Sequence, residues 1–232
     1  MPRKVLVVSA HIGDEILGCG GTLKRHTDEG DSVRVVVLGE GWTSRTKSLA
    51  KGLEAVDLQA FEQQGRSALR MLSIDDVRFH RLPDNRFDKV RSMDLVNLVE
   101  AHKAEFQPDC VYTNTAIDLG IDQRMTCEAV LIAFGRTTTD CCSELYVFEV
   151  LSSSNWEAGM SGLCPELNHF VDITATIPAK IDALRALETE IRPWPHSRSL
   201  EAVIHQARVR GATVGCDAAE AFTILRSTYR SH

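Results

Sequence analysis

The stretch KVLVVSAHIGDEILGCGGTL, residues 4–23, decides the fold. Lys4 to Ser9 is an apolar run rich in β-branched residues, which is typical of a buried strand. A helix is expected from Ile16 to Glu29, because Gly30 stands where a C-terminal cap belongs. The glycines of this stretch lie inside the helix rather than in the turn before it. They are therefore not a dinucleotide-binding fingerprint.

Strand-like and helix-like segments alternate along the next part of the chain. The patterns predict strands and helices in turn over residues 33–38, 53–72, 77–82, 93–106, 109–114, 122–135 and 144–150. This order predicts an α/β fold, Rossmann-like and three-layered, with a mainly parallel sheet. Ligands of such sheets bind beyond the carboxyl ends of the strands, so the loops that follow the strands should carry the functional site.

The C-terminal third has a different character. Ser152 to Leu167 is rich in small residues and is expected to be a loop, and His169 to Ile173 is expected to add a strand. Helices are expected at Ile177 to Ile191 and at Leu200 to Arg210. Since neither an internal repeat nor a linker divides the sequence, we expect one domain over residues 1–232.

Composition excludes several classes of protein. The 232 residues are 44% hydrophobic and 25% charged, as in ordinary globular proteins, and the net charge of −6 argues against a basic face for nucleic acid. Apolar runs are far shorter than the roughly 20 residues that span a bilayer. The seven cysteines include no CxxC pair. With no signal-peptide pattern either, these features predict a cytoplasmic protein with reduced thiols.

His11 and Asp14 stand at the end of the first expected strand. Three residues apart, they can both face one ion or one ligand at the carboxyl edge of the sheet. Asp14 and Glu15 can equally be explained as acidic residues in the first turn of a helix, where the helix dipole favours them. Spacing alone leaves both interpretations open.

Five ordered blocks resemble the PIG-L / LmbE-type zinc-dependent N-deacetylases. AHIGDEILGCGGTL is similar to that family's AHPDDExLGCGGT signature, and YTNTAIDLGIDQRMTCEAV to its YTHxxxDLNxDHRxxxEAV block. LGEGWTSR, FHRLPDNRFD and RPWPHSRSLEA resemble the loops after the second and third strands and a C-terminal block. The similarity extends from about residue 3 to about residue 226.

The resemblance implies a particular zinc chemistry, and this sequence departs from it. In the family, zinc is held by the histidine and second aspartate of AHPDDE and by the histidine of DHR, while the first aspartate is the general base. His11 and Asp14 match the first two ligands, but Gln123 stands in place of the third. Gly13 replaces the base, and Gly120 replaces a polar residue that polarises the substrate carbonyl. Losing a general base alone typically costs about 10²–10⁴ in rate.

Three hypotheses follow. The first is a repurposed enzyme that acts on an amino sugar, a nucleotide sugar or a glycosylated metabolite without the family's zinc-water mechanism. It would hold no tightly bound cofactor, with zinc at low affinity at most, on His11 and Asp14. The second is an active metal-dependent N-deacetylase with rearranged ligands, in which Asp118 or Asp122 supplies the missing charge. The third is a non-catalytic binding or partner subunit.

The candidate site residues come from the loops that match the family. His11, Asp14 and Asp122 are the expected catalytic residues. The expected contacts to substrate are Glu40, Ser44, Arg45, Arg86, Asp118, Gln123, Arg124, His196 and Arg198. Solvated loops, turns and helix caps would explain many of these residues equally well. The expected partner is a small carbohydrate-like molecule, with no nucleic acid and no membrane, and the resemblance is compatible with a homo-oligomer.

Overall fold

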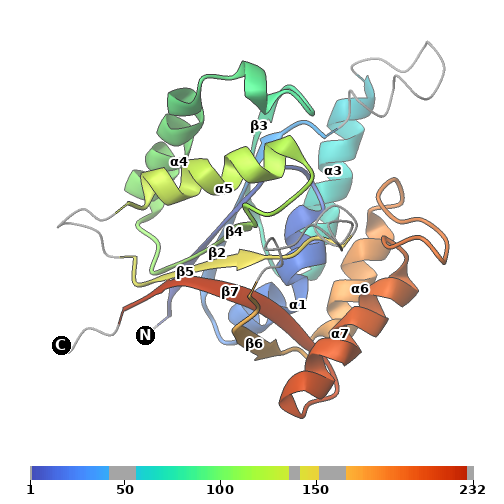
Figure 1. The fold of residues 1–232 in the computed structure, drawn as a ribbon. Coiled ribbons are helices and arrows are strands. Elements are labelled where there is room, and N and C mark those ends of the chain that lie inside the picture. The colour runs from blue at the N-terminus through green and yellow to red at the C-terminus, as the bar shows by residue number, and fades with distance from the viewer. Residues whose placement is uncertain (1, 42–55, 136–141, 152–165, 229–232) are drawn as a thin grey trace.

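A seven-stranded sheet forms the centre of the fold, with the strand order β3-β2-β1-β4-β5-β7-β6 (Figure 1). The structure is a computed structural model, which describes residues 2–41, 56–135, 142–151 and 166–228. The strands are β1 (Lys4–Ser9), β2 (Ser32–Gly39), β3 (Asp76–Leu82), β4 (Cys110–Asn114), β5 (Glu144–Phe148), β6 (His169–Asp172) and β7 (Ala219–Ser227). The helices are α1 (Asp14–Asp28), α3 (Val56–Met71), η1 (Phe87–Lys89), α4 (Ser92–Phe106), α5 (Ile121–Ala133), α6 (Ile177–Ala186) and α7 (Leu200–Val214).

Helices cover both faces of the sheet. α4 and α5 lie on one face, and α1, α3, α6 and α7 lie on the other (Figure 1). β1 shows why: Val5 and Val7 belong to the core beneath α1 and α3, whereas Leu6 and Val8 belong to the core beneath α4 and α5. A strand that is apolar on both faces needs cover on both, as in parallel sheets generally.

The expected α/β fold with a mainly parallel sheet is confirmed. β1 pairs in parallel with β2 and β4, and β2–β3 and β4–β5 are parallel as well. β7 is antiparallel to both β5 and β6. β7 was not among the expected strands. It begins with Ala219, Glu220 and Ala221, which have weak strand propensity.

The helix expected over Ile177 to Ile191 is shorter than its pattern suggested. α6 ends at Ala186, and the chain then turns, so that Leu187 and Glu190 are both buried. Leu187 joins the hydrophobic core, and both side chains lie beside Gly13 in the loop after β1. The helix expected from Leu200 to Arg210 is longer than expected, since it continues to Val214.

α1 contains an internal break that a buried ion pair satisfies. Cys19 has non-helical angles, with φ −142° and ψ 16°. Beyond the break, the amides of residues 21–22 donate to the Glu220 carboxylate at 2.9 and 2.7 Å. Before it, the Leu17 carbonyl accepts from the Lys180 ammonium at 2.7 Å, and Lys180 also contacts Glu220 at 2.6 Å. Both charged side chains are only 4% exposed. The pair thus replaces helix hydrogen bonds that the break removes.

Two expectations from composition can be compared with the described residues. None of their helices is both long and apolar enough to cross a membrane. The cysteines at positions 19, 110, 127, 142 and 216 all carry free thiols.

Candidate active site

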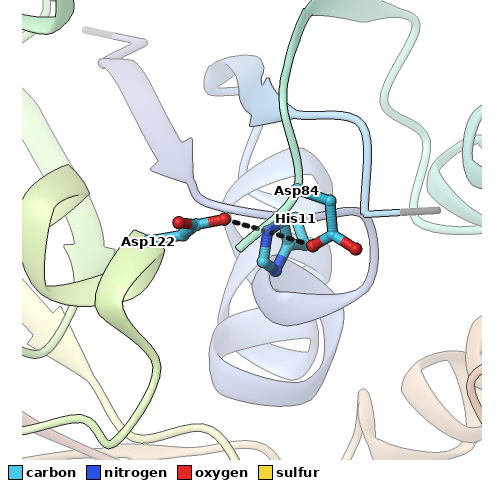
Figure 2. A group of neighbouring side chains, drawn as sticks. All are labelled: His11, Asp84 and Asp122. Carbon is cyan, nitrogen blue, oxygen red and sulfur yellow. Dashed lines mark hydrogen bonds and ion pairs between the residues drawn. The ribbon is translucent and has the colours of Figure 1, made fainter. Parts of the chain in front are cut away.

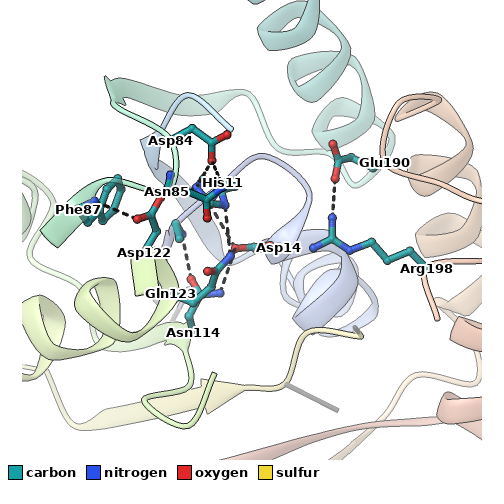
Figure 3. Close-up of polar contacts among 11 residues, drawn as sticks. His11, Asp14, Asp84, Asn85, Phe87, Asn114, Asp122, Gln123, Glu190 and Arg198 are labelled. Atoms are coloured by element: carbon teal, nitrogen blue, oxygen red, sulfur yellow. Dashed lines mark hydrogen bonds and ion pairs between the residues drawn. The ribbon is translucent and has the colours of Figure 1, made fainter. Parts of the chain in front are cut away.

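The candidate site lies where the loops after β1, β3 and β4 meet (Figure 3). His11 follows β1 and Asp14 begins α1. Asp122 and Gln123 lie in the first turn of α5, and Asp84 comes from the loop after β3. All five side chains are buried. Because β1 lies between β2 and β4 in the sheet, parallel pairing brings these loops to one edge.

Two carboxylates hold one nitrogen of the His11 ring. His11 Nε2 lies 2.9 Å from Asp122 Oδ2 and 3.1 Å from Asp84 Oδ1 (Figure 2). The Asp122 carboxylate is fixed in turn by the backbone amides of Asn85, at 2.7 Å, and Phe87, at 3.0 Å. These contacts determine the orientation of the imidazole ring, as carboxylate partners commonly do for functional histidines.

The same contacts control the pKa of His11. Burial by itself would lower this pKa, because it disfavours the charged ring. The hydrogen bonds to Asp122 and Asp84, together with the charge of Asp14, outweigh burial and raise the pKa of His11 to about 9. The carboxylates therefore favour a protonated imidazole at neutral pH.

Gln123 faces the other nitrogen of the ring. Its amide Nε2 lies 3.2 Å from His11 Nδ1 and 3.1 Å from Asp14 Oδ2. Asp14 Oδ2 also accepts from Asn114 Nδ2 at 3.1 Å and from the His11 amide at 3.3 Å (Figure 3). The Asp14 carboxylate fixes the amide with its nitrogen inward, since an amide oxygen there would face a carboxylate oxygen. An amide donor needs a lone pair on Nδ1, so this hydrogen bond favours the neutral ring. The two carboxylates at Nε2 favour the protonated ring instead.

His11, Asp14 and Gln123 have the spacing of a metal site without its full donor set. Ligand atoms around tetrahedral zinc, with bonds near 2.0 Å, lie about 3.3 Å apart. The Gln123 amide nitrogen is 3.1–3.2 Å from the other two atoms, so it occupies the place of a third ligand. The amide nitrogen of Gln123 carries protons, whereas a metal ligand at that place would offer a lone pair. The three residues as arranged do not fit a zinc ion held in the way of the family motif.

Gly120 is sterically matched to Gln123. A Cβ atom at position 120 would lie 1.9 Å from Gln123 Oε1 and 3.1 Å from Asp118 Oδ1. The first distance is far inside van der Waals contact, so the side-chain conformation of Gln123 requires glycine at position 120. The two departures from the family pattern at the start of α5 are therefore structurally coupled.

This coupling gives a first testable prediction. Gly120→Ala should destabilise the wild-type chain by about 1–3 kcal/mol, because the Gln123 amide must move away from its partners. In a Gln123→Ala background the same change should cost much less, which gives a coupling energy of about 0.5–3 kcal/mol. Denaturant unfolding of the four proteins measures this energy, and additive effects would contradict the proposed fit.

Glu190 and Arg198 lie beside Gly13. Gly13 has φ +97°, and a Cβ there would lie 3.3 Å from Glu190 Cγ and 3.4 Å from Leu187 Cδ1. The Glu190 carboxylate accepts from Arg198 Nη1 at 2.9 Å (Figure 3). Sequence reasoning selected Arg198 but missed Glu190, which it assigned to a continuous helix. The break after α6 is what brings this carboxylate against the loop after β1.

Asp118 and Arg124 shape the loop between β4 and α5. Asp118 is buried, and its Oδ1 accepts from the Gly120 amide at 2.7 Å. The Arg124 guanidinium donates to the carbonyls of Asp118 and Leu119. The Asp118 contact is the turn interaction expected as the alternative to a substrate-binding role, whereas Arg124 contacts backbone carbonyls and not the acidic side chain expected as its alternative partner.

The remaining candidates are not fully buried where the structure describes them. Glu40 is half-buried after β2, and its amide donates to the Leu82 carbonyl at 3.0 Å. Arg86 and His196 are exposed, and His196 Nδ1 accepts from the Arg198 amide at 3.0 Å. Ser44 and Arg45 lie outside the described residues.

Several solved structures share this fold. N,N'-diacetylchitobiose deacetylase from Pyrococcus horikoshii aligns with a TM-score of 0.76 and 20% identity over 97% of this chain and 84% of its own. A deacetylase of the teicoplanin biosynthesis pathway gives 0.74 and 18%, over 98% and 100% of the two chains. GalB, the 4-carboxy-2-hydroxymuconate hydratase of Pseudomonas putida KT2440, gives 0.77 and 16%, over 99% of each.

Sequence comparison identifies the family. No curated protein sequence matches the chain. The family model described as GlcNAc-PI de-N-acetylase (PIG-L) matches residues 6–134, which is more than half of the 232 residues and includes most of β1 and all of α1 and α5. The motif around His11 and Asp14, the sheet order and this match agree, and the chain belongs to the PIG-L family.

Proposed function

We propose that the chain is an enzyme that acts on a carbohydrate-like small molecule without a zinc-bound water in the His-Asp-His ligand set of its family. The substrate class is an amino sugar, a nucleotide sugar or a glycosylated metabolite. His11, Asp14 and Asp122 form the reaction centre, and the loops after β2, β3 and β4 contact the substrate.

One observation carries this proposal. The amide nitrogen of Gln123 lies 3.1–3.2 Å from both His11 Nδ1 and Asp14 Oδ2, where it donates hydrogen bonds instead of a lone pair. Gly13 adds to the argument, because it offers no carboxylate to activate a water. The buried polar centre around His11 nevertheless remains. Burying such groups costs free energy, and clusters of titratable groups of this kind are typical of functional sites.

The fold is compatible with reactions other than deacetylation. GalB, which has this fold, is described as a hydratase. A hydratase adds water to a carbon–carbon double bond and has no acyl group to remove. This comparison supports a changed reaction and leaves the substrate open, because 16% identity reports on the fold alone.

Metal content tests the proposal directly. After dialysis against a chelator and then metal-free buffer, the wild-type chain should retain well below one zinc per chain. The reason is that only two of the three family positions offer a ligand. Elemental analysis by mass spectrometry measures this content. Zinc close to one per chain, and lost in an Asp14→Asn variant, would overturn the proposal.

Turnover provides a second check on the same proposal. The wild-type chain should not hydrolyse N-acetyl amino sugars at a rate typical of enzymes, which is about 1–10³ per second. Hydrolysis at such a rate would show that the family chemistry persists. Tight sugar binding with no turnover of any kind would instead favour a binding subunit.

A further inference from the structure

The side of His11 that faces away from Gln123 has the spacing of a second, different ligand set. One atom each from His11, Asp84 and Asp122 lies within 4.8 Å of the other two. His11 Nε2 is 2.9 Å from Asp122 Oδ2 and 3.1 Å from Asp84 Oδ1. Metal–ligand bonds of about 2.1 Å at right angles place neighbouring ligand atoms about 3 Å apart. The two contacts therefore match adjacent positions around an octahedral ion.

The three ligand atoms are buried and held in place. The side chains of His11, Asp84 and Asp122 are 10%, 2% and 0% exposed. Two backbone amides hold the Asp122 carboxylate, which has about four lone-pair sites and so can still take a further partner. Little side-chain entropy remains to be lost when an ion binds, because these groups are already ordered.

Charge also favours a cation at this position. Three buried carboxylates, those of Asp14, Asp84 and Asp122, surround a single imidazole, so these four side chains carry an excess of negative charge. A buried excess of this kind is costly without a counter-charge. One imidazole with two carboxylates is an oxygen-rich set, which suits a divalent ion such as Mn²⁺ better than a thiolate or tris-imidazole set would.

We propose that His11, Asp84 and Asp122 form an exchangeable site for a divalent cation, bound at His11 Nε2. The ion would take the place of the imidazole proton at Nε2. The ring would then keep its remaining proton on Nδ1, so the Gln123 amide, now 3.2 Å away, would have to move from that nitrogen. The inference rests on the proposed function, because it assigns a cofactor to the same reaction centre. It differs from the family arrangement in two of the three ligands. The set includes Asp122, one of the two carboxylates that the second hypothesis, a deacetylase with rearranged ligands, would use to complete a metal site.

Titration with Mn²⁺, followed by the loss of its free-ion electron paramagnetic resonance signal, tests the site. The wild-type chain should bind one Mn²⁺. Asp84→Asn removes a ligand and keeps its shape, so the affinity should fall by at least about 100-fold. Asp14→Asn is the comparison variant, because it removes a neighbouring charge and no ligand, so it should lower the affinity clearly less than Asp84→Asn does. Circular dichroism and thermal unfolding confirm that each variant folds, and Asp84→Ser serves as a second ligand deletion.

Each other outcome overturns the inference. A wild-type chain that binds no Mn²⁺ at millimolar concentration refutes the site and leaves the proposed function standing. Binding that is lost with Asp14→Asn and kept with Asp84→Asn refutes both, since the ion would then use the family's side of His11. Equal losses in both variants would mean an ion held from both sides, which is a different site from the one proposed.

Discussion

Gln123→His is expected to raise the zinc affinity of the chain by at least about two orders of magnitude. Even a missing partner behind a metal ligand typically costs 10–100-fold in affinity, and a missing ligand costs more. An imidazole Nε2 at position 123 would lie about where the Gln123 amide nitrogen now lies, 3.1–3.2 Å from His11 Nδ1 and Asp14 Oδ2. The change exchanges a proton donor for a lone pair and so completes a tetrahedral set with one open position.

Competition with a chromophoric zinc chelator measures this gain. Gln123→Ala is the control, because it removes the amide without adding a ligand, and it should leave the affinity within about tenfold of wild type. Turnover should not follow, since Gly13 still offers no base. Equal affinities in the histidine and alanine variants would mean that position 123 does not face the ion, and the argument from Gln123 would fail.

Glu220→Ala should destabilise the fold by about 3–5 kcal/mol, because it leaves the Lys180 ammonium buried without its counter-charge. It also removes the acceptor for the two amides that follow the break in α1. Urea unfolding, monitored by far-ultraviolet circular dichroism, measures the change. If the variant does not fold, Glu220→Gln keeps the shape and one of the two acceptor oxygens, so it should show a smaller loss.

The exposed pair between Arg91 and Asp94 is the matched control. It has a similar N–O distance, 2.9 Å, but its side chains are 85% and 43% exposed. Solvent screens such pairs strongly, so Asp94→Ala should leave the unfolding midpoint almost unchanged. Comparable losses from Glu220→Ala and Asp94→Ala would show that burial does not determine the importance of the α1 ion pair.

The layered fold could be predicted because its signals are local. β1 lies at the residues its apolar run indicates, and the alternation of strands and helices implies the parallel pairing. The end of α6 could not be predicted in this way. Its sequence keeps a helical period as far as Ile191, but the helix ends at Ala186, and Leu187 and Glu190 then lie beside Gly13, a neighbour that is distant in sequence.

The candidate site could likewise be predicted only in part. The places of His11, Asp14 and Gln123 in one cluster followed from strand ends and from the family's block pattern. That Asp84 would reach the His11 ring did not follow, because PDN also reads as an ordinary turn, and the backbone of Asn85 is left-handed there, with φ 53°. The clearest signal would have been an acidic residue directly after a third parallel strand, at the same edge of the sheet as His11.

The fit between Gly120 and Gln123 constrains how this site could change by mutation. A side chain at position 120 collides with the Gln123 amide, whereas histidine at position 123 removes that amide and the collision with it. A chain returning to the family pattern by single substitutions would therefore have to change position 123 first and position 120 second. Libraries that randomise position 120 alone should return almost only glycine, while libraries that first fix histidine at 123 should accept polar residues at 120. At these two positions the order of the steps, rather than their number, limits a return to the family pattern, and Gly13 remains a separate change.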